Sequence, residues 1–260
     1  IGQDIVFHLA ALIAIPHSYD APQSYVDVNV TGTLNVLEAA KRHGIGKVIQ
    51  TSTSEVYGTA LRKPIDEDHP LQGQSPYSAS KIAADMMAEA YVRSFSLPVV
   101  TLRPFNTFGP RQSERAVLST MIRQALDPEC TEIRLGDLSP TRDFNYVGNT
   151  VDAFLAVGGS ESLDHGQPYN AGTGIEVSIG EMVEKVQAAT GTNKPVVQDE
   201  ARLRPAASEV RALVADYSRL GSACGWTPAV DLDEGVARTV DWWRGRIESG
   251  QFRRSADYLT

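Results

Sequence analysis

Residues 47–58 read KVIQTSTSEVYG and contain the transition on which the fold depends. The first five residues have the length of a strand and contain the apolar, β-branched pair Val48 and Ile49. Hydroxyl groups and one carboxylate follow directly in residues 51–55. Open parallel sheets place ligand-binding residues at this position, beyond the carboxyl end of a strand. The stretch therefore predicts a strand whose end contributes to a polar site.

Apolar runs and helical patterns alternate on both sides of this stretch. The patterns predict strands at 5–9, 47–51, 97–103, 132–136, 169–172 and 195–198, and helices at 27–43 and 77–94, the first ending at Gly44. Strands separated by helices of this length predict a parallel sheet with helical crossovers.

Two further helices are predicted in the second half of the chain. They begin after Ser178 and Asp231, where Glu181 and Glu234 follow three residues later and can complete capping boxes. The last helix carries one apolar face, made of Val236, Val240, Trp243 and Ile247. This face predicts packing onto a small second domain.

Composition excludes several classes of partner. The formal net charge of −8 argues against nucleic acid, whose phosphates would be repelled. No apolar run approaches the ~20 residues that a membrane helix needs. Cys130 and Cys224 are isolated and the histidines are scattered, so no metal site is expected. Two unpaired thiols are typical of a reduced, cytoplasmic protein.

Tyr77 and Lys81 form the strongest chemical pattern. A spacing of four residues places both side chains on one helix face. Lowering a tyrosine pKa by about three units takes roughly 4 kcal/mol. An ammonium about 4 Å away, at an effective dielectric of about 20, supplies roughly that amount. We therefore expect that Tyr77, paired with Lys81 and next to a positively charged nicotinamide, can remove a proton from a sugar hydroxyl. Taken alone, the pair also fits an exposed helix surface.

The wider pattern resembles a known family. LAA at 9–11, NVTGT at 29–33, TSEVYG at 53–58, YSASK at 77–81 and RPFNTFGP at 103–110 occur in order. RDFNYV at 142–147, YNAG at 169–172 and RP at 204–205 continue the series. Together they resemble the signature of extended short-chain dehydrogenases/reductases that act on nucleotide sugars, the NAD-dependent epimerase/dehydratase family.

The resemblance implies a Rossmann-like, doubly wound parallel sheet with a smaller mixed α/β substrate domain. It assigns 1–104 and 145–175 to the NAD-binding domain, and 105–144 and 176–260 to the nucleotide-sugar domain. The family's first strand and Gly-rich turn are expected upstream of residue 1. The family also implies a homodimer built on the helix that contains Tyr77 and the helix before it.

The resemblance also implies roles for individual residues. Catalysis would involve Tyr77, Lys81, Thr53, Ser54 and Glu55, and the substrate would contact Asn106, Arg111, Arg142 and Arg204. NAD would lie along Leu9, Ala10, Ala11, Asn29, Thr51, Ser52, Tyr77, Lys81 and Pro104. Arginine suits the diphosphate because its planar donor fork matches phosphate oxygens.

Glu55 favours one reaction within the family. A 4,6-dehydratase must remove the C5 proton after oxidation at C4, whereas a simple 4-epimerase needs no carboxylate at this position. Ser54 replaces the Asp that acts as the C6 acid in dTDP-glucose dehydratases, so Thr53 or a water would assist the leaving hydroxyl. We expect a 4,6-dehydratase acting on UDP- or GDP-N-acetylglucosamine, similar to those of legionaminic-acid-type pathways for cell-surface polysaccharides.

Three alternatives stay open. UDP-glucuronate decarboxylases also resemble the Ser-Glu-Val-Tyr-Gly segment, and a 4-epimerase shares the remaining machinery. A shortened protein that binds nucleotide sugars without catalysis is a third possibility. The retention of Tyr77, Lys81 and Glu55 together argues against a pure binding protein.

Overall fold

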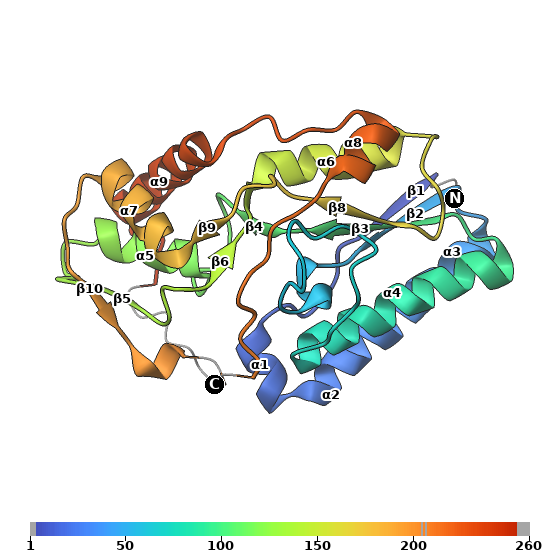
Figure 1. The fold of residues 1–260 in the computed structure, drawn as a ribbon, viewed down its shortest axis with the longest axis horizontal. Coiled ribbons are helices and arrows are strands. Elements are labelled where there is room, and N and C mark those ends of the chain that lie inside the picture. Colours follow the sequence, from blue (N-terminus) through green and yellow to red (C-terminus); the bar gives the residue numbers. More distant parts are fainter. Residues whose placement is uncertain (1–3, 204, 206, 254–260) are drawn as a thin grey trace.

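The computed structural model describes residues 4–203, 205 and 207–253. At its centre is a four-stranded parallel sheet with the strand order β1-β2-β3-β8 (Figure 1). The strands are β1 (Ile5–His8), β2 (Lys47–Thr51), β3 (Val99–Pro104) and β8 (Pro168–Ala171). Each lies within two residues of its predicted position. The predicted α/β fold with a parallel sheet is confirmed.

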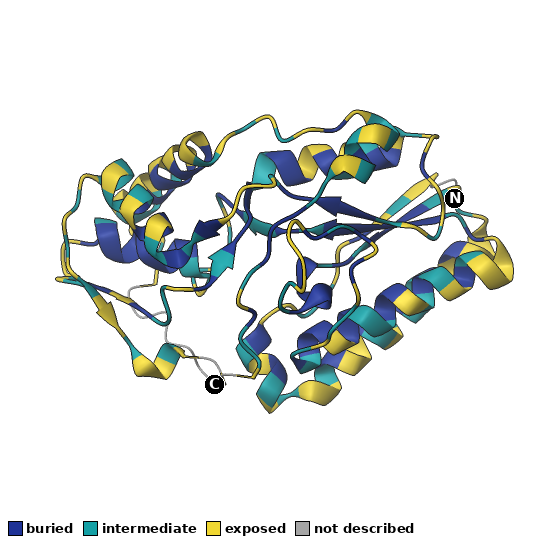
Figure 2. Ribbon diagram, viewed as in Figure 1, coloured by how far each residue is buried: buried dark blue, intermediate teal, exposed yellow. Residues whose placement is uncertain are grey.

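Helices cover both faces of the sheet (Figure 1). One face carries α3 (Gly32–His43) and α4 (Pro76–Phe95), and the other carries α6 (Val147–Gly159) and α8 (Ser218–Cys224). Because successive strand side chains point to opposite faces, Val48 packs against α3 and α4 whereas Ile49 packs against α6. The strands β2, β3 and β8 are consequently mostly buried, whereas β1 at the edge of the sheet is partly exposed and the helices expose their outer sides (Figure 2).

The predicted helix at 27–43 is divided. Residues 15–31 form α1 (Ile15–Asp20), α2 (Pro22–Tyr25) and the π-helix η1 (Val26–Thr31), and regular helix begins at α3. Gly44 ends α3 as predicted, with φ of 60° in the left-handed region that glycine adopts without strain. Local wide turns of this kind occur where a side chain must be presented at a specific point.

A second helical layer lies beside the sheet. Its helices α5 (Val117–Leu126), α7 (Ile179–Thr190) and α9 (Leu232–Glu248) pack around Met121, Met182 and Trp243 in one apolar cluster. The short strands around it are β4 (Asn106–Phe108), β5 (Ile133–Leu135), β6 (Thr141–Arg142), β7 (Phe144–Tyr146), β9 (Val177–Ser178) and β10 (Val196–Gln198). They pair as β4–β7, β5–β10 and β6–β9.

The predicted helix starts are found in part. Ser178 and Glu181 form a complete capping box at α7. At α9 the Asp231 side chain accepts from the Glu234 amide, but the Glu234 carboxylate pairs with Arg238 instead of returning to the cap. The predicted apolar face of α9 is buried in the cluster around Trp243, with Val236 and Val240 nearly inaccessible.

The domain boundaries given above stay a prediction, although β8 does enter the main sheet after the chain has passed through α5. Across residues 4–203, 205 and 207–253, none of the helices has the length and apolarity needed to cross a membrane.

Asn149 fastens the chain around Trp226 to α6. Its side-chain oxygen accepts from the amides of Ala229 (3.0 Å) and Val230 (2.9 Å), and its amide donates to the Val230 carbonyl at 2.8 Å. The residue is 1% exposed, so these backbone groups would lose their partners without gaining water. Asn149→Ala is therefore expected to lower the free energy of unfolding by about 3 kcal/mol.

Urea unfolding measures this effect, with Asn35→Ala at an exposed position of α3 as the matched control. Equal stabilities of the two variants would show that Asn149 does not fasten this segment.

Candidate active site

The carboxyl ends of the four strands meet at one edge of the sheet. All strand pairs are parallel, so His8, Thr51, Pro104 and Ala171 end their strands on the same side. Ligands bind at this edge in open α/β sheets. The segments that follow, starting at residues 9, 52, 105 and 172, contain most of the predicted site residues.

Asn29 holds the segment after β1 against α4. Its side-chain oxygen accepts from the Leu12 amide at 2.9 Å, and its amide donates to the Leu12 carbonyl at 3.0 Å. The same amide donates to Ser80 Oγ on α4 at 2.9 Å. The π-helix η1 thus presents a buried Asn29 that fixes residues 9–12 next to the helix of Tyr77.

Tyr77 and Lys81 lie on the buried side of α4, as predicted. Ser75 begins this helix, with its hydroxyl accepting from the Ser78 amide, and Pro76 occupies the first turn. Tyr77 is 6% exposed and Lys81 is 4% exposed. The Lys81 ammonium donates to the Thr51 carbonyl at 2.6 Å, which joins α4 to the end of β2.

Without a bound cofactor, the pKa of Tyr77 lies above its ordinary value. Burial raises the pKa of Tyr77, a hydrogen bond with Thr53 opposes this rise, and the negative charge of Glu55 adds to it. Burial also lowers the pKa of Lys81. Desolvation disfavours both charged forms, and it outweighs the attraction that the sequence argument considered.

Glu55 faces a cavity together with two other predicted residues. The cavity has a volume of about 150 Å³, and Glu55, Asn106 and Arg142 all line it. Further lining residues belong to α5, β5, β7 and α7 and to the segments that contain Asp137, Leu203 and Glu209. Asn106 Oδ1 is buried and has no hydrogen-bond partner among the described residues. Glu55 is 9% exposed, so it is not the solvated carboxylate of an ordinary turn.

Arg142 forms a buried ion pair with Glu209. Arg142 Nη2 lies 3.0 Å from Glu209 Oε1, and Nη1 donates to the Thr141 carbonyl at 2.9 Å. The neighbouring Asp143 carboxylate accepts from the amides of Thr173, Gly174 and Ala215. Asp143 therefore fixes the strand from which Arg142 enters the cavity.

Other predicted residues lie at the same edge with differing exposure. Leu9 and Ala10 are exposed, Ala11 and Pro104 are half-buried, and Ser54 is buried. The Thr53 hydroxyl accepts from the Glu55 amide. Arg111 is exposed with φ of 68°, a left-handed conformation that is uncommon for arginine, and it does not line the cavity. Arg204 lies outside the described residues.

A buried polar network was not predicted from the sequence. The Asp85 carboxylate pairs with Arg103 at 3.0 Å and accepts from Ser52 Oγ at 2.8 Å. Arg103 Nη1 donates to Tyr57 Oη, which donates to Asn170. Burial raises the pKa of Tyr57 to about 12, despite the opposing charge of Arg103. The signal was present, since a charge inside the apolar strand 99–104 requires a buried partner.

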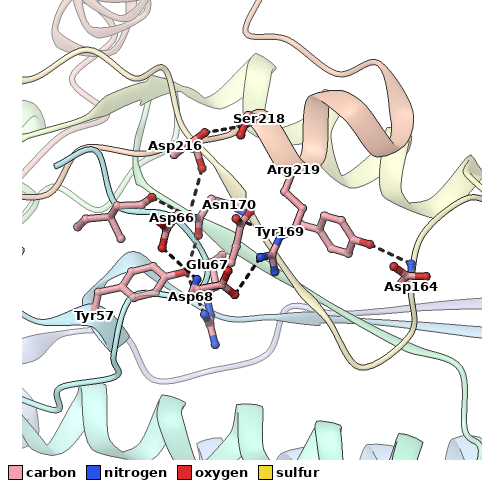
Figure 3. Close-up of polar contacts among 12 residues, drawn as sticks. Tyr57, Asp66, Glu67, Asp68, Asp164, Tyr169, Asn170, Asp216, Ser218 and Arg219 are labelled. Carbon is pink, nitrogen blue, oxygen red and sulfur yellow. Dashed lines mark hydrogen bonds and ion pairs between the residues drawn. The ribbon is translucent and has the colours of Figure 1, made fainter. Parts of the chain in front are cut away.

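The network continues to α8 (Figure 3). The backbone amide of Asn170 donates to Glu67 Oε1 at 2.8 Å, and Glu67 Oε2 lies 3.4 Å from Arg219 Nε. Burial raises the pKa of Glu67, against the hydrogen bond from Asn170. Figure 3 shows Tyr57, Glu67 and Asn170 close together, with the Arg219 side chain directed toward Glu67.

Comparisons with known proteins agree with this geometry. The sequence profile of a family described as GDP-mannose 4,6 dehydratase matches residues 1–239. The chain belongs to the nucleotide-sugar epimerase/dehydratase family. The match covers nearly the whole chain and agrees with the parallel sheet.

Individual members of the family differ in their reactions. The chain is 36% identical over 250 residues to a UDP-glucose 4-epimerase of Mycolicibacterium smegmatis, covering 94% of this chain and 77% of the relative. It is 35% identical over 242 residues to a dTDP-glucose 4,6-dehydratase of Streptomyces griseus, covering 93% and 72%. The solved structure of TunA, an NAD-dependent NDP-hexosamine 5,6-dehydratase, matches with a TM-score of 0.85 and 31% identity, covering 94% and 77%.

His8 gives the site edge a pH-dependent stability. Burial lowers its pKa below the ordinary value of 6.5, and the charge of Lys81 lowers it further. The unfolded chain therefore takes up this proton near 6.5, whereas the folded chain takes it up at lower pH. The contribution of His8 to stability is thus lost as pH falls through 6.5 toward the folded pKa.

Urea unfolding at a series of pH values from about 7.5 to 5.5 measures this loss. His8→Asn should flatten the dependence, whereas His165→Asn, at an exposed position, should leave it unchanged. Parallel curves for the wild type and His8→Asn would contradict the assignment.

Proposed function

We propose that the protein is an NAD-dependent nucleotide-sugar 4,6-dehydratase that acts on UDP- or GDP-N-acetylglucosamine. The observation that carries the proposal is the position of Glu55. Its carboxylate lines a cavity with Asn106 and Arg142 and acts electrostatically on Tyr77. An epimerase needs a proton-transfer group at C4, whereas a dehydratase needs a second one at C5.

The residues at the end of β2 fit the cofactor. Thr51 Oγ1 is buried and has no hydrogen-bond partner among the described residues. The neighbouring Lys81 ammonium has three N–H donors, and among the described residues it donates one hydrogen bond, to the Thr51 carbonyl. Unused buried donors and acceptors are costly unless a ligand satisfies them. A ligand with ribose hydroxyls satisfies both, and NAD would be held here between residues 9–12 and α4.

When bound, NAD supplies a hydride acceptor for C4, a hydride donor for C6 and a positive charge that favours the Tyr77 phenolate. Tyr77 takes the proton of the C4 hydroxyl. The ketone formed at C4 makes the C5 proton acidic, and Glu55 removes that proton. The hydroxyl at C6 leaves as water, with its proton supplied through Thr53 or a water molecule. Protonation of C5 then completes a 4-keto-6-deoxy sugar.

Arg142 is suited to the diphosphate. Its guanidinium is buried at the cavity wall, where phosphate oxygens can compete with Glu209 for the same donors. Asn106 offers to the same cavity a side-chain oxygen that has no partner among the described residues. Arg111 and Arg204 belong to the proposed substrate contacts as predictions from the family resemblance. A cytoplasmic location is part of the same proposal.

Glu55→Gln tests the dehydratase reaction. The amide keeps the size of the side chain but cannot accept the C5 proton, so kcat should fall by about 100-fold or more. The full-length protein is incubated with UDP- and GDP-N-acetylglucosamine, and the product is followed by mass spectrometry. With the wild type, the product should be lighter than the substrate by the mass of one water. Glu234→Gln, an exposed change on α9, is the matched control.

Other outcomes identify the alternatives. Interconversion of sugars with unchanged mass, in the wild type and in Glu55→Gln alike, would show a 4-epimerase. Loss of carbon dioxide from UDP-glucuronate would show a decarboxylase. Binding of the nucleotide sugars without conversion would show the non-catalytic protein.

We also propose a homodimer built on α4 and the helical segment η1–α3. Val26 and Val28 on η1 and Met86 on α4 are large apolar side chains with 39–45% exposure, and η1 packs against α4. Light scattering of the full-length protein should give twice the chain mass, and Met86→Glu should reduce it. A wild-type mass of one chain would contradict the dimer.

A further inference from the structure

The two proton-transfer groups of the proposed reaction lie on different elements. Tyr77 belongs to α4, whereas Glu55 belongs to η2 (Ser54–Tyr57), in the turn that follows β2. The distance between the phenol and the carboxylate therefore depends on how this turn is held against α4. The effect of this connection on the reaction rate rests on the proposed function.

Asp85 holds the start of the turn. It follows Lys81 by four residues on the same side of α4, and its side chain is 2% exposed. Its Oδ2 accepts from Ser52 Oγ at 2.8 Å, from Arg103 Nε at 3.1 Å and from Arg103 Nη2 at 3.0 Å. Lys81 holds the carbonyl of the preceding residue, Thr51. Successive turns of α4 thus hold successive residues at the end of β2.

Arg103 holds the other end of the turn. Its Nη1 donates to Tyr57 Oη at 2.9 Å, and its guanidinium carbon lies 5.0 Å from the centre of the Tyr57 ring. Tyr57 is fully buried and donates onward to Asn170 at 2.7 Å. Both ends of residues 52–57 are therefore fastened to the same ion pair.

We propose that Asp85 is a positioning residue. With Arg103 it forms a clamp, consisting of Ser52, Asp85, Arg103 and Tyr57, that fixes the Glu55 carboxylate relative to the Tyr77 phenol. Asp85 does not touch the substrate in this role. It acts through Ser52 and Arg103.

Stability alone does not account for the clamp. A buried ion pair is a weak source of stability, because desolvation offsets the attraction between the charges. Asp85 Oδ1 is also buried with no hydrogen-bond partner among the described residues, which adds to the cost. These costs are explained if the clamp serves the geometry of the site.

The test separates positioning from folding with two variants and one control. Ser52→Ala removes the link to the turn but leaves the Asp85–Arg103 pair intact. Asp85→Asn removes the charge while keeping the size of the side chain. Glu89→Gln, one turn further along α4 in an ion pair with Arg93, is the matched control. Hydrogen–deuterium exchange of residues 53–58 and steady-state kinetics are measured on the full-length proteins.

In Ser52→Ala and Asp85→Asn, exchange at residues 53–58 should accelerate by about tenfold or more, while α9 keeps its protection. With the dehydratase assay, kcat should fall by about 100-fold and KM should change by less than about threefold, because misplacement of reacting groups lowers the rate rather than binding. Glu89→Gln should match the wild type in both measurements.

The proposal would be overturned if Ser52→Ala left both exchange and kcat unchanged and Asp85→Asn lowered thermal stability alone. The Asp85–Arg103 ion pair would then be purely structural. A wild-type protein without turnover would refute the proposed function instead. The exchange measurement does not depend on turnover, and it would then decide the positioning role by itself.

Discussion

The site depends on one constraint, which is that the four strands of the central sheet all run in the same direction. Parallel pairing brings the ends of β1, β2, β3 and β8 to one edge, although they are separated by up to 163 positions in the chain, from residue 8 to residue 171. Helices cover both faces, so this edge is where polar groups can meet a ligand. Asn29, Lys81 and Asp85 each join one of these strand ends to η1 or α4.

Burial decides the electrostatics at this edge. Tyr77, Lys81 and the Asp85–Arg103 pair are all at most 6% exposed, and desolvation is the largest cause of the pKa shifts of Tyr77 and Lys81. Desolvation therefore disfavours the phenolate form of Tyr77 and the ammonium form of Lys81, and a bound charge would change this balance. The same burial makes hydrogen bonds strong and missing partners expensive, which accounts for the many buried side chains that hold backbone groups in place.

The sequence is sufficient to predict the elements whose signals are local. Apolar runs located the four strands, and Gly44 and Ser178 marked helix ends correctly. The π-helix before α3 escaped prediction because its apolar spacing differs little from that of a regular helix. Burial raises the pKa of Tyr77 in the chain without cofactor, an effect that the sequence does not reveal, because spacing shows the neighbouring charge but not the depth of burial.

Contacts between residues that are distant in the sequence were also not predicted. Glu209 pairs with Arg142 across 67 positions, and Asp85 pairs with Arg103 across 18 positions. The local sequence pattern does not identify these partners, although a charged residue within an apolar strand indicates that a buried partner exists. The family signature supplied the cavity residues Glu55, Asn106 and Arg142, whereas the side chains that hold them in place became visible in the structure.

In the proposed reaction, the hydride removed from C4 returns to C6, and Glu55 removes the C5 proton. This reaction is tested most directly with a nucleotide-linked N-acetylglucosamine that carries deuterium at C4, with the product examined by NMR. Deuterium is expected at C6 of a 4-keto-6-deoxy sugar. Deuterium that returns to C4, with the C6 oxygen retained, would contradict the proposed reaction.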